Sequence, residues 1–218
     1  MVSKRLIEIS QLISTERLID IGTDHGLLPI YVLERGIVAK AIGVDKSNLA
    51  LGQARVNQEK SAEGEHLELV CADGLEALNV KETDCIVLAG MGGRNIVQIL
   101  SSGKMESARQ IITQANSNQP FLRRFLSEKG WKIERENILR HQKKLYVTIS
   151  WKKGTETLTE KEISLGKILA RERPELWLDW LRKERERMQK IQKSQLGIAL
   201  SATQSQYLIW LEEEIALD

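Results

Sequence analysis

The chain has 218 residues, 42% of them hydrophobic, and a formal net charge of +2. This length is sufficient for one domain with a substantial core and an appendage. No apolar run could cross a membrane, no N-terminal stretch resembles a signal peptide, and no spacing of histidine and cysteine suits zinc, so we expect a cytoplasmic protein without a metal.

The first two-thirds of the chain alternate between strand and helix patterns. Apolar residues at helical spacing follow Ser3, a suitable N-cap, and predict an N-terminal helix. Strands are predicted at residues 17–21, 39–44, 67–71, 84–89, 109–114, 131–139 and 144–151, and further helices at about 27–35, from 47 through 59, after 93 to about 100, and at 121–128. This alternation indicates an α/β fold with a parallel sheet covered on both faces. A closing strand pair, with one strand antiparallel to the rest, matches Rossmann-like methyltransferases better than dehydrogenases.

The two cysteines bear on the compartment in which the protein works. Cys71 and Cys85 both fall in apolar, strand-like runs. We expect both to be buried thiols, as suits a reducing cytosol.

From about residue 155 the pattern is helical. One apolar face is shared by Leu165, Leu169, Leu176, Trp180 and Met188. Pro174 interrupts or restarts this helix, and turn residues around Gly197 precede a second apolar stripe. We therefore expect a first domain over residues 1–153 and a C-terminal, coiled-coil-like helical hairpin over 154–218. Its tryptophans are interpreted as packing residues, with base stacking as the alternative.

The most informative motif is the glycine turn after the first strand, Asp20-Ile21-Gly22-Thr23-Asp24-His25-Gly26. Glycine allows backbone to approach a ligand at the carboxyl edge of a sheet. The middle glycine of a dinucleotide fingerprint is missing, and the acidic Asp24 lies between Gly22 and Gly26. Such a turn suits a cationic or neutral ligand better than a pyrophosphate. S-adenosylmethionine carries a sulfonium and an ammonium, so a methyltransferase is the first hypothesis.

Acids also follow the second and third strands. Asp45 is placed to accept hydrogen bonds from both ribose hydroxyls of a nucleoside, although it would equally cap the next helix. Asp73, before Gly74, would accept the exocyclic amine of adenine. Acids at three successive strand ends, with Asp20 the first, favour a nucleoside site.

Two further loops reach the same predicted edge. Gly90-Met91-Gly92-Gly93 follows the fourth strand and allows a bulky substrate to come close. Gln114 and Asn116 follow the fifth strand, where their carboxamides would either match a flipped base or form turns and caps.

Asp24 and His25 lie where cofactor and substrate would meet. Methyl transfer to adenine N1 produces a cationic ring, which a carboxylate would stabilise or deprotonate. Asp24 is our candidate for this role, and contact with the cofactor ammonium or the backbone is the alternative. His25 would orient Asp24 or stack on a base, or it has only a structural role.

Positive charge is concentrated between residues 120 and 153, where ten lysines and arginines, Arg123 and Arg124 among them, face three glutamates. This imbalance favours a polyanionic partner such as nucleic acid, with a solvated surface as the alternative.

Taken together, these motifs resemble the bacterial tRNA (adenine-22-N1)-methyltransferases. The matching blocks are residues 3–6, 20–29, 41–45, 73–75 and 84–93, and the resemblance extends over the whole chain. The D-x-G-x-D-H and A-G-M-G-G motifs are specific in combination. Ala115 stands where the family pattern has proline, and Asp45 where glutamate is expected.

The resemblance implies a Rossmann-like class I methyltransferase sheet that uses S-adenosylmethionine, with C-terminal helices that help to bind tRNA. The predicted cofactor-binding residues are Asp20, Gly22, Asp45, Lys46, Asp73, Gly74, Ala89, Gly90 and Met91. The predicted substrate-binding residues are Arg5, Gly92, Gly93, Gln114 and Asn116, and the predicted catalytic residues are Asp24 and His25. Methylation of another RNA or a small molecule, and RNA binding without catalysis, are the alternatives. We expect a monomer.

Overall fold

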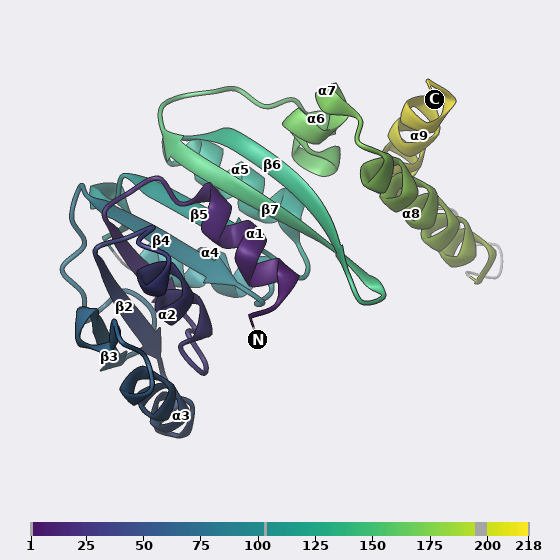
Figure 1. Ribbon diagram of the computed structural model, residues 1–218. Coiled ribbons are helices and arrows are strands. Elements are labelled where there is room, and N and C mark those ends of the chain that lie inside the picture. Colours follow the sequence, from purple (N-terminus) through teal and green to yellow (C-terminus); the bar gives the residue numbers. More distant parts are fainter. Residues whose placement is uncertain (1, 103, 195–199, 218) are drawn as a thin grey trace.

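The computed structural model describes residues 2–102, 104–194 and 200–217. Within these ranges, seven strands form one sheet in the order β3-β2-β1-β4-β5-β7-β6 (Figure 1). The strands are β1 (Arg17–Ile21), β2 (Lys40–Asp45), β3 (Leu67–Cys71), β4 (Asp84–Ala89), β5 (Gln110–Gln114), β6 (Trp131–His141) and β7 (Lys144–Lys153). Strands β1 to β5 pair in parallel, whereas β7 is antiparallel to both its neighbours. The predicted parallel sheet with an antiparallel closing pair is confirmed.

Helices cover both faces of this sheet (Figure 1). The helices α1 (Lys4–Leu12), α2 (Leu27–Glu34) and α3 (Asn48–Glu59) lie on one face, and α4 (Gly93–Ser102) and α5 (Gln119–Glu128) on the other. Because side chains alternate along a strand, Leu18 and Val87 join the cluster of α1 and α2, while Ile19 belongs to the larger cluster with α4 and α5. The Ser3 and Ser47 hydroxyls cap α1 and α3, as predicted.

The expectation of two buried thiols is wrong for Cys71. Cys85 on the central strand β4 is buried, but Cys71 is exposed. The reason is that Cys71 is the last residue of β3, and β3 is the edge strand of the sheet. An apolar run predicts the strand but not which of its ends reaches the core.

The C-terminal segment is helical, as predicted, and contains α6 (Glu160–Leu165), α7 (Lys167–Glu172), α8 (Glu175–Ser194) and α9 (Ala202–Ala216). The helical conformation is interrupted between α7 and α8, at Arg173 and Pro174. Helices α8 and α9 pack together as the expected hairpin and extend away from the sheet (Figure 1). The predicted turn residue Gly197 lies outside the described residues. Trp177 of α8 shares one hydrophobic cluster with Trp151 of the sheet, so the core continues past residue 153, and the division at 153/154 remains a prediction.

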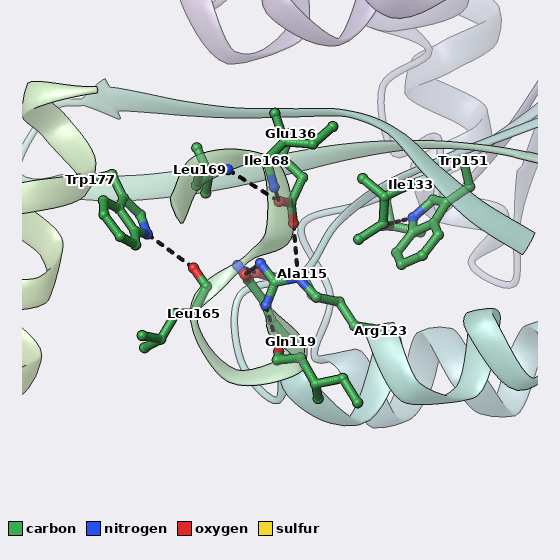
Figure 2. Close-up of polar contacts among 12 residues, drawn as sticks. Ala115, Gln119, Arg123, Ile133, Glu136, Trp151, Leu165, Ile168, Leu169 and Trp177 are labelled. Atoms are coloured by element: carbon green, nitrogen blue, oxygen red, sulfur yellow. Dashed lines mark hydrogen bonds and ion pairs between the residues drawn. The ribbon is translucent and has the colours of Figure 1, made fainter. Parts of the chain in front are cut away.

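A buried ion pair joins the sheet to the C-terminal helices (Figure 2). Arg123 Nε donates to Glu136 Oε1 at 2.9 Å, and both side chains are at most 2% exposed. Glu136 Oε2 also accepts the backbone N–H of Ile168 at 2.7 Å and that of Leu169, at the start of α7. Arg123 Nη1 donates to the Ile163 carbonyl oxygen of α6 at 3.0 Å.

This geometry corrects one part of the predicted basic surface. Arg123 is a buried structural residue and does not reach a partner. Arg124, Arg140 and Lys152 are exposed but form ion pairs with Glu160, Asp179 and Glu134. The stretch is therefore less positive at the surface than its sequence indicates.

Candidate active site

The strand order reverses between β1 and β4, because the chain runs from β1 outward to β3 and from β4 outward to β6. Loops that leave adjacent strands in opposite directions open a crevice at the carboxyl ends of those strands. The glycine turn at residues 20–26 and the loop at residues 90–93 both lie at this edge. The topology thus brings the two strongest sequence motifs side by side.

The glycine turn is compact because three of its residues have a left-handed backbone: Gly22 (φ +74°), Asp24 (φ +53°) and Gly26 (φ +69°). The backbone N–H groups of Gly22 and Thr23 both donate to the Val44 carbonyl oxygen, at 2.8 and 2.9 Å. A Cβ atom at Gly22 would lie 2.6 Å from the Met91 Cε. The positive φ at 22 favours glycine, and a larger residue there would also displace the Met91 side chain, whose end lies against the turn.

Asp45 ties this turn to the next strand. Its Oδ2 accepts the backbone N–H of Asp24 at 3.1 Å, and its Oδ1 accepts that of Ser47 at 2.9 Å. The cap of α3 is Ser47, so the alternative that Asp45 itself caps this helix is wrong. The carboxylate is partly exposed at the crevice, beside the turn that it holds.

Asp20 is the buried acid of the site, with 5% of its surface exposed. The pKa of its carboxyl group is raised to about 7, chiefly by burial and in smaller part by the charge of Asp45. The nearby Thr23 side chain and the charge of Arg5 lower the pKa in part. A carboxyl group in this position would be stabilised as its anion by a cationic ligand.

The loops after β4 and β5 are tied together by backbone and side-chain bonds. The Gly90 N–H donates to the Gln114 carbonyl oxygen at 3.1 Å, and the Asn116 N–H to the Met91 carbonyl oxygen at 2.8 Å. Asn116 Nδ2 donates to the Gly90 carbonyl oxygen at 2.7 Å. Asn116 is exposed at the edge, and these bonds hold its backbone and side chain against the loop after β4, although alanine and not proline precedes it.

The other predicted residues of these loops differ in whether they are accessible to a ligand. The Gln114 side chain is buried, its Nε2 donates to Thr148 Oγ1 at 2.7 Å, and its Oε1 has no partner among the described residues. A Cβ atom at Gly93 would lie 2.6 Å from the Asn118 carbonyl oxygen, so glycine at 93 is required by packing. Gly92 is partly exposed, and Ala89 is the last residue of β4.

Arg5 reaches the edge from the start of α1. Its guanidinium carbon lies 5.4 Å from the centre of the Tyr146 ring. A Cβ atom at Gly90 would lie 3.5 Å from Arg5 Nη1, so the guanidinium lies beside this loop. Tyr146 was missed by the sequence reasoning because strand alternation alone does not connect it with Arg5, which is far away along the chain.

Glu8, also missed, lies one turn further along α1. Burial raises the pKa of its carboxyl group to about 7, and a hydrogen bond with Asn137 lowers that pKa in part. No local motif marks Glu8, since its burial depends on β6.

Asp24 and His25 lie at the open side of the turn, with side chains 72% and 50% exposed. His25 Nε2 is 3.3 Å from Asp24 Oδ1, so the histidine is placed to orient the carboxylate. The His25 carbonyl oxygen accepts a hydrogen bond from Asn57 of α3. This pair is accessible to a substrate in the crevice.

The remaining predicted residues lie further from the crevice centre. Lys46 and Asp73 are exposed after β2 and β3, and β3 is two strands away from β1. A Cβ atom at Gly74 would lie 2.8 Å from Ile99 Cγ2, so packing against α4 also requires glycine there. Within the described ranges, no group of three or more histidine, cysteine or acidic side chains could hold a metal ion, and no helix is long and apolar enough to span a membrane.

The sheet order, the antiparallel β7 and the acidic turn at the switch point define a Rossmann-like class I methyltransferase. A family model described as a methyltransferase domain matches residues 2–149. The chain is 30% identical over 186 residues to the tRNA (adenine(22)-N(1))-methyltransferase of Bacillus subtilis, covering 81% of this chain and 78% of that one. It belongs to this methyltransferase family.

Solved structures agree with this assignment over the whole chain. A putative tRNA (m1A22) methyltransferase of Streptococcus pneumoniae superposes with a TM-score of 0.91 at 28% identity, covering 99% of this chain and 100% of that one. The same pneumococcal protein in complex with S-adenosyl-L-methionine superposes with a TM-score of 0.90 at 27% identity, with equal coverage.

Proposed function

We propose that this protein transfers a methyl group from S-adenosylmethionine to N1 of adenine 22 in tRNA. The observation that carries the proposal is the acidic crevice at the switch point, where Asp20 and Asp45 flank the turn at Gly22. The Bacillus subtilis relative, named for this activity, supports the choice of target.

The residues of the crevice fit this cofactor. The glycine at 22, favoured by its left-handed backbone, leaves bare backbone at the edge, and the acids there suit a sulfonium and an ammonium group. Asp45 would accept hydrogen bonds from the ribose hydroxyls, Asp73 would accept one from the adenine amine, and Asp20 would lie near the positive charge. The cofactor supplies an electrophilic methyl group when bound, and the relative from Streptococcus pneumoniae has been solved with it.

The chain's task in the transfer is alignment and charge stabilisation. Adenine N1 uses its lone pair to bond the methyl carbon, and the electron pair of the broken carbon–sulfur bond stays on sulfur. The methylated ring is cationic, and Asp24, oriented by His25 at 3.3 Å, would stabilise that charge. Asn116 and Gly92 would position the base, and Arg5, beside the loop at Gly90, would contact the incoming substrate.

The same proposal implies where the protein works and what else it contacts. A tRNA substrate favours the cytoplasm. Its phosphates would meet the basic residues at the tip of the β6–β7 hairpin, Lys143 and Lys144, which are both exposed. The chain is proposed to act as a monomer, with residues 1–153 as the catalytic domain and 154–218 assisting tRNA binding.

The test compares two transcripts of one tRNA that differ only at position 22. Transfer of labelled methyl to the transcript with adenine 22, and none to the one with guanine 22, is the expected result. Equal label in both transcripts would refute the position, and no label in either, with cofactor binding intact, would refute tRNA as the substrate.

Two variants separate binding from catalysis. Gly22→Trp fills the turn and is expected to abolish cofactor binding in a folded protein. Asp24→Asn is expected to keep cofactor affinity and lose most of kcat, because the amide keeps the size of the side chain and removes its charge. Full turnover by Asp24→Asn would remove Asp24 from catalysis.

A further inference from the structure

A cavity of about 980 Å³ lies next to the active-site edge, between the loop after β5 and the C-terminal helices. Residues 116–120 form one wall, and α6, α8 and α9 form the others. This volume is at the upper end of the range found for small-molecule sites. None of the predicted cofactor-binding residues lines it.

Three aromatic side chains line the cavity: Trp180 of α8, and Tyr207 and Trp210 of α9. Each is partly exposed, in contrast to Trp177 one turn earlier, which is 0% exposed and donates its indole N–H to the Leu165 carbonyl oxygen. Helical spacing predicts that the tryptophans are packing residues, and Trp177 has that role. Trp180 and Trp210 also line a space that a planar group could fill.

The charged groups of the cavity are neutralised within the chain. Glu160 pairs with Arg124, with N–O distances of 2.5 and 2.8 Å. Glu184 pairs with Arg187 at 2.7 Å, and the Tyr207 hydroxyl donates to Glu184 at 3.5 Å. Without excess positive charge, this lining does not suit a phosphate; rings and carboxamides suit a neutral heterocycle.

The cavity begins at the edge where methyl transfer would occur. Asn116 lines it and is bonded to the carbonyl oxygens of both Gly90 and Met91. Asn118, also in the lining, makes one long hydrogen bond, at 3.5 Å to Ser117 Oγ, so its carboxamide can also bond the edge of a base.

We propose that this cavity binds the base of a nucleotide adjacent in the RNA chain to the target adenine, stacked on Trp210 and hydrogen-bonded by Asn118. This inference rests on the proposed function for its choice of RNA. The aromatic rings, the neutral lining and the continuity with the acceptor edge favour a base over a phosphate or a peptide.

The test measures the Kd of the full-length protein for two tRNAs that each carry a single abasic site. One has it at the nucleotide just before the target adenine, and the other at the nucleotide just after it. One abasic site is expected to weaken binding to the wild-type protein about tenfold, the loss typical of one stacked base. The same abasic site should have little further effect on Trp210→Leu, because both changes remove one contact and their effects are not additive.

Two more variants distinguish loss of the cavity contact from misfolding of Trp210→Leu. Asn118→Gly removes the carboxamide while the backbone, at φ +55°, suits glycine, and it should show the same coupling more weakly. Phe121→Leu changes an aromatic side chain that is 48% exposed beside the loop but does not line the cavity, and it should bind every transcript like the wild type.

Equal penalties for each abasic site in the wild type and both cavity variants would overturn the proposal. A change in sedimentation of Trp210→Leu, with no coupling to the RNA, would instead identify the cavity as a contact between copies and also overturn it. Because Kd needs no turnover, failure of the wild type to methylate tRNA would refute the proposed function separately.

Discussion

Glu136 and Asp20 are both buried carboxylates, but their surroundings differ. Glu136 accepts hydrogen bonds from Arg123 and from two backbone N–H groups of α7, so its charge is satisfied within the chain. Asp20 lies beside another acid, and burial raises the pKa of its carboxyl group to about 7.

This difference separates a structural charge from one poised for a ligand. A fully hydrogen-bonded buried pair holds elements in one arrangement, and removing one partner leaves the other charge unpaired. A buried acid short of positive charge costs stability when it ionises, and a cationic ligand would offset that cost. The junction of the sheet with α6 and α7 belongs to the first kind, and the switch-point crevice to the second.

The largest expected effect is at the junction. Arg123→Met should lower the free energy of unfolding by about 3–5 kcal/mol, because Glu136 remains buried without its counter-charge. Urea denaturation followed by circular dichroism measures this loss.

The neighbouring residue is the matched control. Arg124→Met breaks an ion pair that is exposed to solvent, and it should leave the urea midpoint almost unchanged. If both variants lost the same stability, the contrast between the buried pair and the surface pair would fail.

The next effect is the pH dependence that Asp20 confers on stability. The pKa is about 7 in the folded protein and near 3.8 when unfolded, so the folded state holds the proton more tightly. Its stabilising contribution is present below pH 4 and is lost as the pH rises through 7. Asp20→Asn cannot ionise, and its stability relative to the wild type should rise by on the order of 4 kcal/mol between pH 4 and pH 8. A constant difference across this range would show that Asp20 titrates normally.

The smallest effect is on cofactor affinity. Between pH 6 and pH 8 the affinity of the wild type for S-adenosylmethionine should rise about tenfold, since ionised Asp20 favours the cation and its pKa is about 7. Titration calorimetry of Asp20→Asn should show no such rise. S-adenosylhomocysteine, which lacks the sulfonium charge, should show a smaller one; an identical rise for both ligands would point to a group other than Asp20.

Local pattern predicted the elements of the fold well. The predicted strands at 17–21, 67–71 and 84–89 coincide with β1, β3 and β4, and the caps at Ser3 and Ser47 are those observed. These features depend on side-chain alternation and on hydrogen bonds between near neighbours, which are written into short stretches of sequence. The positions of the acids at the strand ends were predicted because the ends of the strands are visible in the local sequence.

What local pattern could not predict is which side chains become buried or meet across the sheet. Arg123 was expected among surface charges, and Cys71 in the core; both expectations were wrong because burial depends on α6, α7 and the position of β3 at the sheet edge. Tyr146 beneath Arg5 had no sequence signal, since the two residues meet only when α1 crosses the closing strands.

The sequence by itself determined the order of helices and strands, the glycine turn and the acids at the strand ends, since these follow from the conformational preferences of a few neighbouring residues. Only the tertiary structure decided that Asp20 has a pKa of about 7, that Arg123 is structural, and that Trp180 and Trp210 line a cavity beside the active site. The physical reason is that burial and electrostatic environment are set by atoms distant along the chain, which come together only in the folded protein.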